Sequence, residues 1–180
     1  MSLKLLKKKA YQIWLSIKLS HSSCYLHIKV KGIELWILVI SKSIITKQSE
    51  DLFYFNNIIN IRSSFDYELP ISNSVIRLIF DDVTEKEKDN SYIKFSEKHA
   101  QKIFDFITNM DKSKDLYVNC DAGISRSGAV GFCLNEYFNK YLEDNKEDYT
   151  FFIQENYQIS PNPLVKRILM NKLFGEPQFI

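Results

Sequence analysis

The chain has 180 residues, of which 45% are hydrophobic and 14% aromatic, and its formal net charge is +2. This length suits one domain with a sizeable core, so we expect a single domain over residues 1–180. The longest uninterrupted apolar run, Leu35–Ile40, is far too short to cross a bilayer, which indicates a soluble protein.

The cysteine pattern indicates a reducing compartment. The three cysteines, Cys24, Cys120 and Cys133, are irregularly spaced and match neither a disulfide framework nor a paired Cys-x2-Cys metal pattern. We therefore expect a cytoplasmic protein with free thiols, no metal and no cofactor. Cys24 and Cys133 lie on apolar faces and are interpreted as small core residues.

The positive charge is concentrated at the start of the chain. Residues 1–33 hold seven lysines and no acid, and are interpreted as a basic N-terminal extension of one helix and one strand. We expect this helix to pack on its own domain, with contact to an anionic membrane or partner as the alternative. Its apolar residues recur at helical spacing: Leu3, Leu6, Ala10, Ile13, Trp14 and Ile17.

Taken in chain order, the next predicted elements are strands. Residues Cys24–Val30 alternate strictly between apolar and polar side chains, which is typical of a strand with one wet face, and Lys31-Gly32 is a predicted turn. A second, more buried strand is predicted at Ile33–Ile40. Two short β-branched runs, Ile58–Arg62 and Ser74–Phe80, are bounded by Asn, Ser and Asp and are predicted as interior strands.

The second half of the chain is mostly helical, with one more strand at Asp115–Cys120. The predicted helices cover Phe95–Ile107, with Ser96 as its cap, Ser127–Leu142, Lys146–Tyr157 and Pro163–Leu173. Strands alternating with helices, followed by a helical tail, predict an α/β layer fold whose central, mainly parallel sheet is flanked by helices.

The loop between the last predicted strand and the helix that follows it contains residues suited to binding an oxyanion. The stretch "NCDAGISRS" places Cys120 at a strand end and Arg126 near a helix start, where backbone N–H groups and the helix dipole favour an oxyanion. Gly123 permits backbone torsions that a side chain would forbid. Arg126 adds a planar fork of donors for two phosphate oxygens.

The same donors surround the sulfur of Cys120 and favour its thiolate form. A thiolate beneath a bound phosphate is a nucleophile for in-line displacement and would form a phosphocysteine intermediate. Ser127 can offer its hydroxyl to the sulfur and ease its departure in the second step. The residues predicted to surround the phosphate are Asp121, Ala122, Gly123, Ile124, Ser125 and Arg126.

This loop resembles the Cys-x5-Arg-Ser/Thr signature of the cysteine-dependent phosphatases, and its setting resembles the compact dual-specificity protein phosphatases of bacteria and phages. The segments "WILVISKS", "FNNIINIRSS", "IRLIFDDV", "KHAQKIFDFI" and "PNPLVKRIL" fall in the order and spacing of that family, over about residues 35–170. The resemblance implies a dual-specificity-phosphatase-like fold. It also implies an upstream aspartate that acts as general acid and then as general base.

Two aspartates follow the strand that ends at Phe80 and could fill that role. Aligning the strand ends favours Asp82, with Asp81 as the alternative. Two positions depart from the family pattern. Asn119 stands where histidine is usual, and Asp121 places a negative charge where phosphoinositide-specific relatives carry lysines, which disfavours polyphosphorylated lipids as substrates.

The resemblance and the loop together predict a protein phosphatase that hydrolyses phosphotyrosine, with phosphoserine and phosphothreonine left open. The expected partners are phosphorylated proteins or peptides and phosphate-type oxyanions. No nucleic-acid partner is expected, because the body of the chain is acidic and offers no basic track. The alternative, motivated by Asn119 and by the uncertain acid, is a catalytically weak phosphatase-like module that binds phosphorylated partners.

Overall fold

The computed structural model describes residues 24–30, 33–45, 56–64, 74–141 and 156–175. Within these residues, five strands form one sheet in the order β1-β2-β5-β3-β4. The strands are β1 (Cys24–Val30), β2 (Ile33–Ser41), β3 (Asn57–Arg62), β4 (Val75–Ile79) and β5 (Leu116–Cys120). The helices are α2 (Lys42–Ile45), α4 (Glu97–Asn109), α5 (Arg126–Tyr141) and α7 (Pro163–Phe174).

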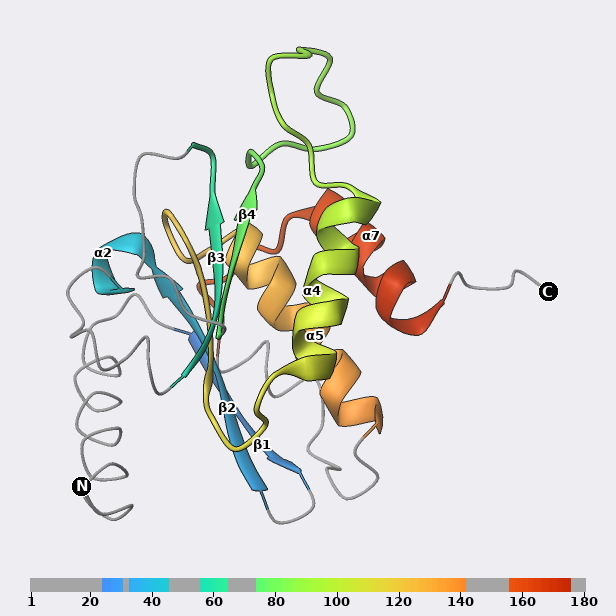
Figure 1. The fold of residues 1–180 in the computed structure, drawn as a ribbon. Coiled ribbons are helices and arrows are strands. Elements are labelled where there is room, and N and C mark those ends of the chain that lie inside the picture. The colour runs from blue at the N-terminus through green and yellow to red at the C-terminus, as the bar shows by residue number, and fades with distance from the viewer. Residues whose placement is uncertain (1–23, 31–32, 46–55, 65–73, 142–155, 176–180) are drawn as a thin grey trace.

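The predicted α/β fold with a mainly parallel sheet is confirmed. Strand β1 pairs with β2 in antiparallel fashion, whereas β2, β5, β3 and β4 run parallel to one another. Helix α5 packs on β2 and β5, α4 contacts β4, and α7 packs against both helices, so that these three helices lie on one side of the sheet (Figure 1). The hydrophobic core fills the space between them.

Most predicted elements occur where the sequence places them. The prediction that Ser74–Phe80 is an interior strand is wrong, because β4 lies at the edge of the sheet. Helix α4 starts directly after the predicted cap Ser96, and α2 is a short element that the sequence patterns did not predict. The predicted N-terminal helix and the 31–32 turn lie outside the described residues. The predicted helix at Lys146–Tyr157 lies almost entirely outside them too, and its described end, 156–157, is a turn. Among the described residues, no helix is long and apolar enough to span a membrane.

The strand order brings three loops together. Parallel strands present their carboxyl ends at one edge of the sheet, and β5 lies between β2 and β3 although it comes last in the chain. Cys120, at the end of β5, is paired in register with Ser41 of β2, and Asn119 is paired with Asn60 of β3. The residues that follow β3, β4 and β5 therefore lie close together.

Candidate active site

Residues 121–125 form a tight loop that joins β5 to α5. Gly123 has a φ of +75°, and a Cβ at this position would lie 2.7 Å from the backbone nitrogen of Ser41 and 2.8 Å from the carbonyl carbon of Ile40. A side chain is therefore excluded both by the torsion angle and by the neighbouring strand. The backbone N–H of Lys42 donates to the carbonyl oxygen of Asp121 at 3.1 Å, which further ties the loop to the end of β2.

The sulfur of Cys120 lies beneath this loop and is almost fully buried. The hydroxyl of Ser127, itself buried in the first turn of α5, lies 3.0 Å from Sγ, and the backbone N–H of Gly123 donates to Sγ at 3.3 Å. The structure thus brings the predicted nucleophile together with the serine expected to assist it. Both contacts can stabilise negative charge on the sulfur.

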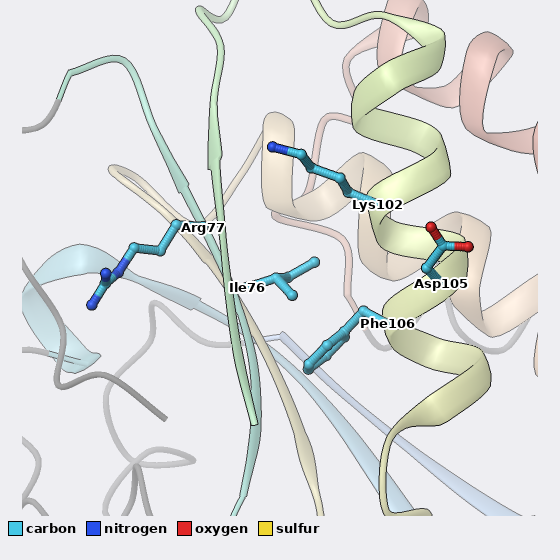
Figure 2. A pocket seen from close by; sticks show the side chains of 5 residues that line it. All are labelled: Ile76, Arg77, Lys102, Asp105 and Phe106. Atoms are coloured by element: carbon cyan, nitrogen blue, oxygen red, sulfur yellow. The ribbon is translucent and has the colours of Figure 1, made fainter. Parts of the chain in front are cut away.

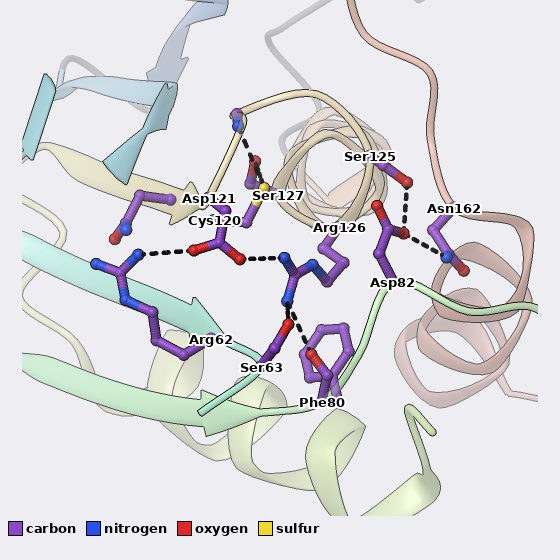
Figure 3. A network of polar contacts seen from close by, with 12 residues as sticks. Arg62, Ser63, Phe80, Asp82, Cys120, Asp121, Ser125, Arg126, Ser127 and Asn162 are labelled. Carbon is purple, nitrogen blue, oxygen red and sulfur yellow. Dashed lines mark hydrogen bonds and ion pairs between the residues drawn. The ribbon is translucent and has the colours of Figure 1, made fainter. Parts of the chain in front are cut away.

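Arg126 is 5% exposed and is held from two sides (Figure 3). Its Nη1 donates to the hydroxyl of Ser63 at 2.8 Å and to the carbonyl oxygen of Phe80 at 2.9 Å, so the residues after β3 and β4 orient the guanidinium. Its Nη2 forms an ion pair with the carboxylate of Asp121. Its buried Nε has no hydrogen-bond partner among the described residues, which leaves a donor available to a ligand in the loop.

Asp121 also contacts a second arginine. Nη1 of Arg62, at the end of β3, donates to Oδ1 of Asp121 at 3.4 Å. The carboxylate therefore lies between two buried guanidinium groups, one from β3 and one from α5 (Figure 3). The sequence patterns singled out neither Arg62 nor Ser63.

The two candidate acids have different surroundings. The Asp82 carboxylate lies against the loop, where its Oδ1 accepts a 2.7 Å hydrogen bond from the hydroxyl of Ser125. The Asp81 carboxylate instead accepts from the backbone N–H of Ile93 at 2.7 Å, and the Asp81 N–H donates to the Ile93 carbonyl oxygen at 2.7 Å. Asp81 thus closes the base of the loop between β4 and α4, and Asp82 is exposed beside residues 121–125.

Asn162 is a site residue that the sequence analysis missed. Its side-chain amide donates to Oδ1 of Asp82 at 2.8 Å and to the carbonyl oxygen of Val83 at 3.1 Å. Its Oδ1 caps α7 by accepting from the N–H groups of Leu164 and Val165. The available signal was an asparagine directly before Pro163, an arrangement typical of an N-cap followed by proline at the first helical position.

The segment before α7 also supports the loop through its backbone. The N–H of Ser160 donates to the carbonyl oxygen of Ile124, and the N–H of Asn162 donates to that of Ser125, each at 3.2 Å. The side chains of Ala122 and Ile124 are exposed on the loop. The loop is therefore held by β2 on one side and by the start of α7 on the other.

Asn119 stands where the family usually has histidine. Its side chain is fully buried and contacts the neighbouring strand β3. Its amide donates to the Oδ1 of Asn60 at 3.3 Å, so the pair links β5 to β3 directly below the cysteine. This hydrogen bond lies within the sheet and does not reach the loop. The loop order comes instead from the contacts of Gly123 and Asp121 with the end of β2.

Cys133 and His99 lie outside this site. Cys133 is buried in α5, as expected, and burial raises the pKa of its thiol, which is thereby kept protonated. His99 packs beside Phe80 and Phe95, and its Nδ1 accepts from the backbone N–H of Ser96 at the start of α4. Burial lowers the pKa of His99; a backbone hydrogen bond with Ile79 opposes this shift and nearby Lys102 adds to it.

A surface hollow of about 440 Å³ lies elsewhere, between β4 and α4 (Figure 2). It is lined by Ile76, Arg77, Lys102, Asp105 and Phe106. None of the residues that the sequence predicts for the site lines this hollow. No group of three or more His, Cys, Asp and Glu side chains within the described ranges is arranged to hold a metal ion.

No protein-family model and no curated protein matches the chain. Solved structures are similar to it. The chain is 15% identical to PTPMT1, crystallised in complex with PI(5)P, with 76% of this chain and 89% of that chain covered and a TM-score of 0.49. The PTP-2 phosphatase of Cydia pomonella is 14% identical, with 81% and 88% covered and a TM-score of 0.48.

A third similar structure is the human tyrosine phosphatase-like serine/threonine/tyrosine-interacting protein. It is 15% identical, with 75% of this chain and 89% of that chain covered and a TM-score of 0.47.

Proposed function

We propose that this chain is a cysteine-dependent phosphomonoesterase that hydrolyses phosphotyrosine in proteins or peptides. The observation that carries the proposal is the convergence of Cys120, Arg126 and Asp82 on one tight loop at the carboxyl edge of the sheet. These residues come from β5, from α5 and from the segment after β4. We further propose that residues 1–180 form one phosphatase domain with its core at about 35–170.

In the proposed first step, the phosphate binds between the N–H groups of residues 121–125 and the guanidinium of Arg126. The Cys120 thiolate attacks phosphorus opposite the leaving oxygen, an S–P bond forms, and the P–O bond to the tyrosine breaks. Asp82 donates its proton to the departing phenolate oxygen. Ser125 and Asn162 hold Oδ1 of Asp82, so that Oδ2 can carry the transferred proton.

In the second step, the Asp82 carboxylate accepts a proton from water as the water oxygen attacks the phosphocysteine. The S–P bond breaks, the sulfur leaves as a thiolate, and inorganic phosphate is released. The hydroxyl of Ser127, 3.0 Å from Sγ, can donate a hydrogen bond to the departing sulfur. The sequence of steps needs no metal ion because Arg126 and the loop N–H groups supply the positive charge.

The experiment is hydrolysis of p-nitrophenyl phosphate by the purified chain in EDTA. We expect vanadate-sensitive turnover that is lost in Cys120→Ser and reduced at least 10²-fold in Arg126→Lys, since lysine cannot reproduce the fixed donor fork. Arg77→Lys is the matched control, because Arg77 is exposed on the edge strand β4. Turnover that persists in Cys120→Ser contradicts the proposal.

Phosphotyrosine, phosphoserine and phosphothreonine peptides of one sequence then define the substrate class. Tight binding of the phosphotyrosine peptide without any release of phosphate would instead identify the chain as a module that binds phosphorylated partners.

A further inference from the structure

Asp121 is an acidic side chain among the groups that are expected to bind an anion. It directly follows Cys120, and its two carboxylate oxygens face different arginines. Oδ2 forms an ion pair with Nη2 of Arg126, and Oδ1 lies 3.4 Å from Nη1 of Arg62 (Figure 3). An incoming phosphate therefore meets a carboxylate that already occupies one donor of Arg126.

The three side chains differ in how firmly they are held. The side chains of Arg62 and Arg126 are only 5% and 6% exposed, whereas that of Asp121 is 46% exposed. The guanidinium groups are enclosed by protein, and the carboxylate lies on their solvent side. Asp121 can consequently turn toward water when an anion binds, and the arginines stay in place.

Arg126 does not depend on Asp121 for its orientation. Its Nη1 is fixed by the Ser63 hydroxyl and by the Phe80 carbonyl oxygen, which belong to segments after β3 and β4. Removal of the carboxylate therefore leaves the guanidinium oriented and frees Nη2. The buried Nε of Arg126, which has no hydrogen-bond partner among the described residues, lies next to Nη2 in the guanidinium plane and completes a two-donor edge.

We propose that Asp121 is an internal competitor for Arg126 that tunes which oxyanions the loop retains. This inference rests on the proposed function of the loop as a phosphate site. The carboxylate must leave Nη2 before a phosphate oxygen can occupy it, and its charge continues to repel the bound anion. Repulsion grows with the charge of the ligand, so Asp121 weakens dianions more than monoanions and promotes release of the product phosphate.

The test compares two tetrahedral oxyanions of similar shape, tungstate with two negative charges and perrhenate with one. Isothermal titration calorimetry of the full chain at pH 7.5 and constant ionic strength gives both affinities without any turnover. We expect Asp121→Asn to bind tungstate roughly 5- to 30-fold more tightly than the unmodified chain does, from the Coulomb energy of one extra like charge at about 4 Å in partly aqueous surroundings. The gain for perrhenate should be several-fold smaller.

Asp111→Asn is the matched control. It removes one negative charge from a side chain of similar exposure, 51%, in the turn before β5, at the opposite end of that strand from Cys120. We expect it to change neither affinity. Asp121→Ser serves as a second variant, and circular dichroism checks that each variant is folded.

The inference is overturned if Asp121→Asn and Asp121→Ser bind tungstate no more tightly than the unmodified chain, or if both ions gain equally. These measurements separate the effect of Asp121 on anion binding from the proposed catalysis. Charge-dependent tightening without any phosphatase turnover supports Asp121 as competitor and contradicts the proposed function. Turnover with unchanged tungstate binding contradicts the competitor alone. If neither the unmodified chain nor the variants bind tungstate, both are contradicted.

Discussion

The hydroxyl of Ser125 donates a 2.7 Å hydrogen bond to the carboxylate of Asp82, and this contact joins two loops that are 43 residues apart in the chain. One loop follows β4, and the other connects β5 to α5 above Cys120. In the proposed reaction, this contact would hold the acid near the oxygen that is protonated as the P–O bond breaks.

Replacement of Asp82 should therefore depend on the leaving group. The tyrosine phenolate, whose conjugate acid has a pKa of about 10, must be protonated as it departs. The leaving group of a strongly activated aryl phosphate departs almost without protonation. We expect Asp82→Asn to lower kcat on a phosphotyrosine peptide by roughly 10²-fold or more and to lower it clearly less on the activated substrate. Asp81→Asn should change both only modestly, because Asp81 binds the backbone of Ile93. Exchanged behaviour of the two variants would assign the acid to Asp81.

Asn162 should position Asp82 in addition to capping α7. Its amide holds Asp82 and its Oδ1 accepts from the first N–H groups of α7, so two substitutions can separate these roles. Asn162→Ser keeps a cap acceptor but is too short to reach Asp82, and Asn162→Ala removes both contacts. We expect a similar loss of kcat on phosphotyrosine in both variants.

Stability should distinguish the same two variants. Urea denaturation should find Asn162→Ala less stable than Asn162→Ser by about 0.5–2 kcal/mol, the usual contribution of an N-cap side chain. The positioning role is contradicted if the serine variant keeps full activity, or if its loss of kcat is the same for phosphotyrosine and for an activated aryl phosphate.

Gly123→Ala should displace the loop and abolish oxyanion binding. The added methyl group would lie under 3 Å from backbone atoms of Ile40 and Ser41, so the loop must move and its contact with the Cys120 sulfur must break. We expect phosphate hydrolysis to fall at least 10²-fold. Gly175→Ala is the matched control: Gly175 also has a positive φ, +80°, but nothing lies within 4 Å of its added methyl group. It should cost about 1–3 kcal/mol of stability and leave activity unchanged.

Cys120 and Cys133 should react differently with iodoacetamide. Burial raises the pKa of the Cys133 thiol, and that side chain is fully enclosed in the core. We expect peptide mapping after brief treatment at pH 7.5 to find Cys133 unmodified, because protonated thiols do not react, and to find Cys120, the nucleophile of the proposed reaction, modified. Tungstate should protect Cys120. Equal modification of both residues in the folded protein would contradict this assignment.

Protonation of His99 should destabilise the protein in mildly acidic solution. Burial lowers the pKa of His99 below its ordinary value of 6.5, so the unfolded chain takes up this proton at a higher pH than the folded chain. The stability contributed by neutral His99 is complete above pH 6.5 and is lost as the pH falls through the lower, folded-state pKa. The protonated ring also cannot accept the hydrogen bond from the Ser96 N–H.

His99→Gln tests this linkage, because glutamine at the third helical position can complete the same capping box without titrating. We expect the urea midpoint of the unmodified chain to fall between pH 7 and pH 5 and that of the variant to fall less. Parallel decreases in the two proteins would show that other groups cause the acid sensitivity.

Local sequence patterns were sufficient for most elements of the fold and for the position of the loop that follows β5. Strand β1 follows from alternation, α4 from helical spacing after Ser96, and the loop from a cysteine, a glycine and an arginine within eight positions. Each of these signals acts over a few residues, because side-chain direction and backbone torsion depend on near neighbours. The parallel sheet also follows from the alternation of strands with helices.

The sequence by itself determined where the loop between β5 and α5 lies and which residues it contains, because the strand end, the glycine and the helix start are adjacent in the chain. Only the tertiary structure decided which side chains meet that loop. The insertion of β5 between β2 and β3 brings Arg62 to Asp121, and the docking of α7 brings Asn162 to Asp82. These contacts span 59 and 80 residues, and no local pattern encodes them, since they depend on the order of the strands and on how the helices pack.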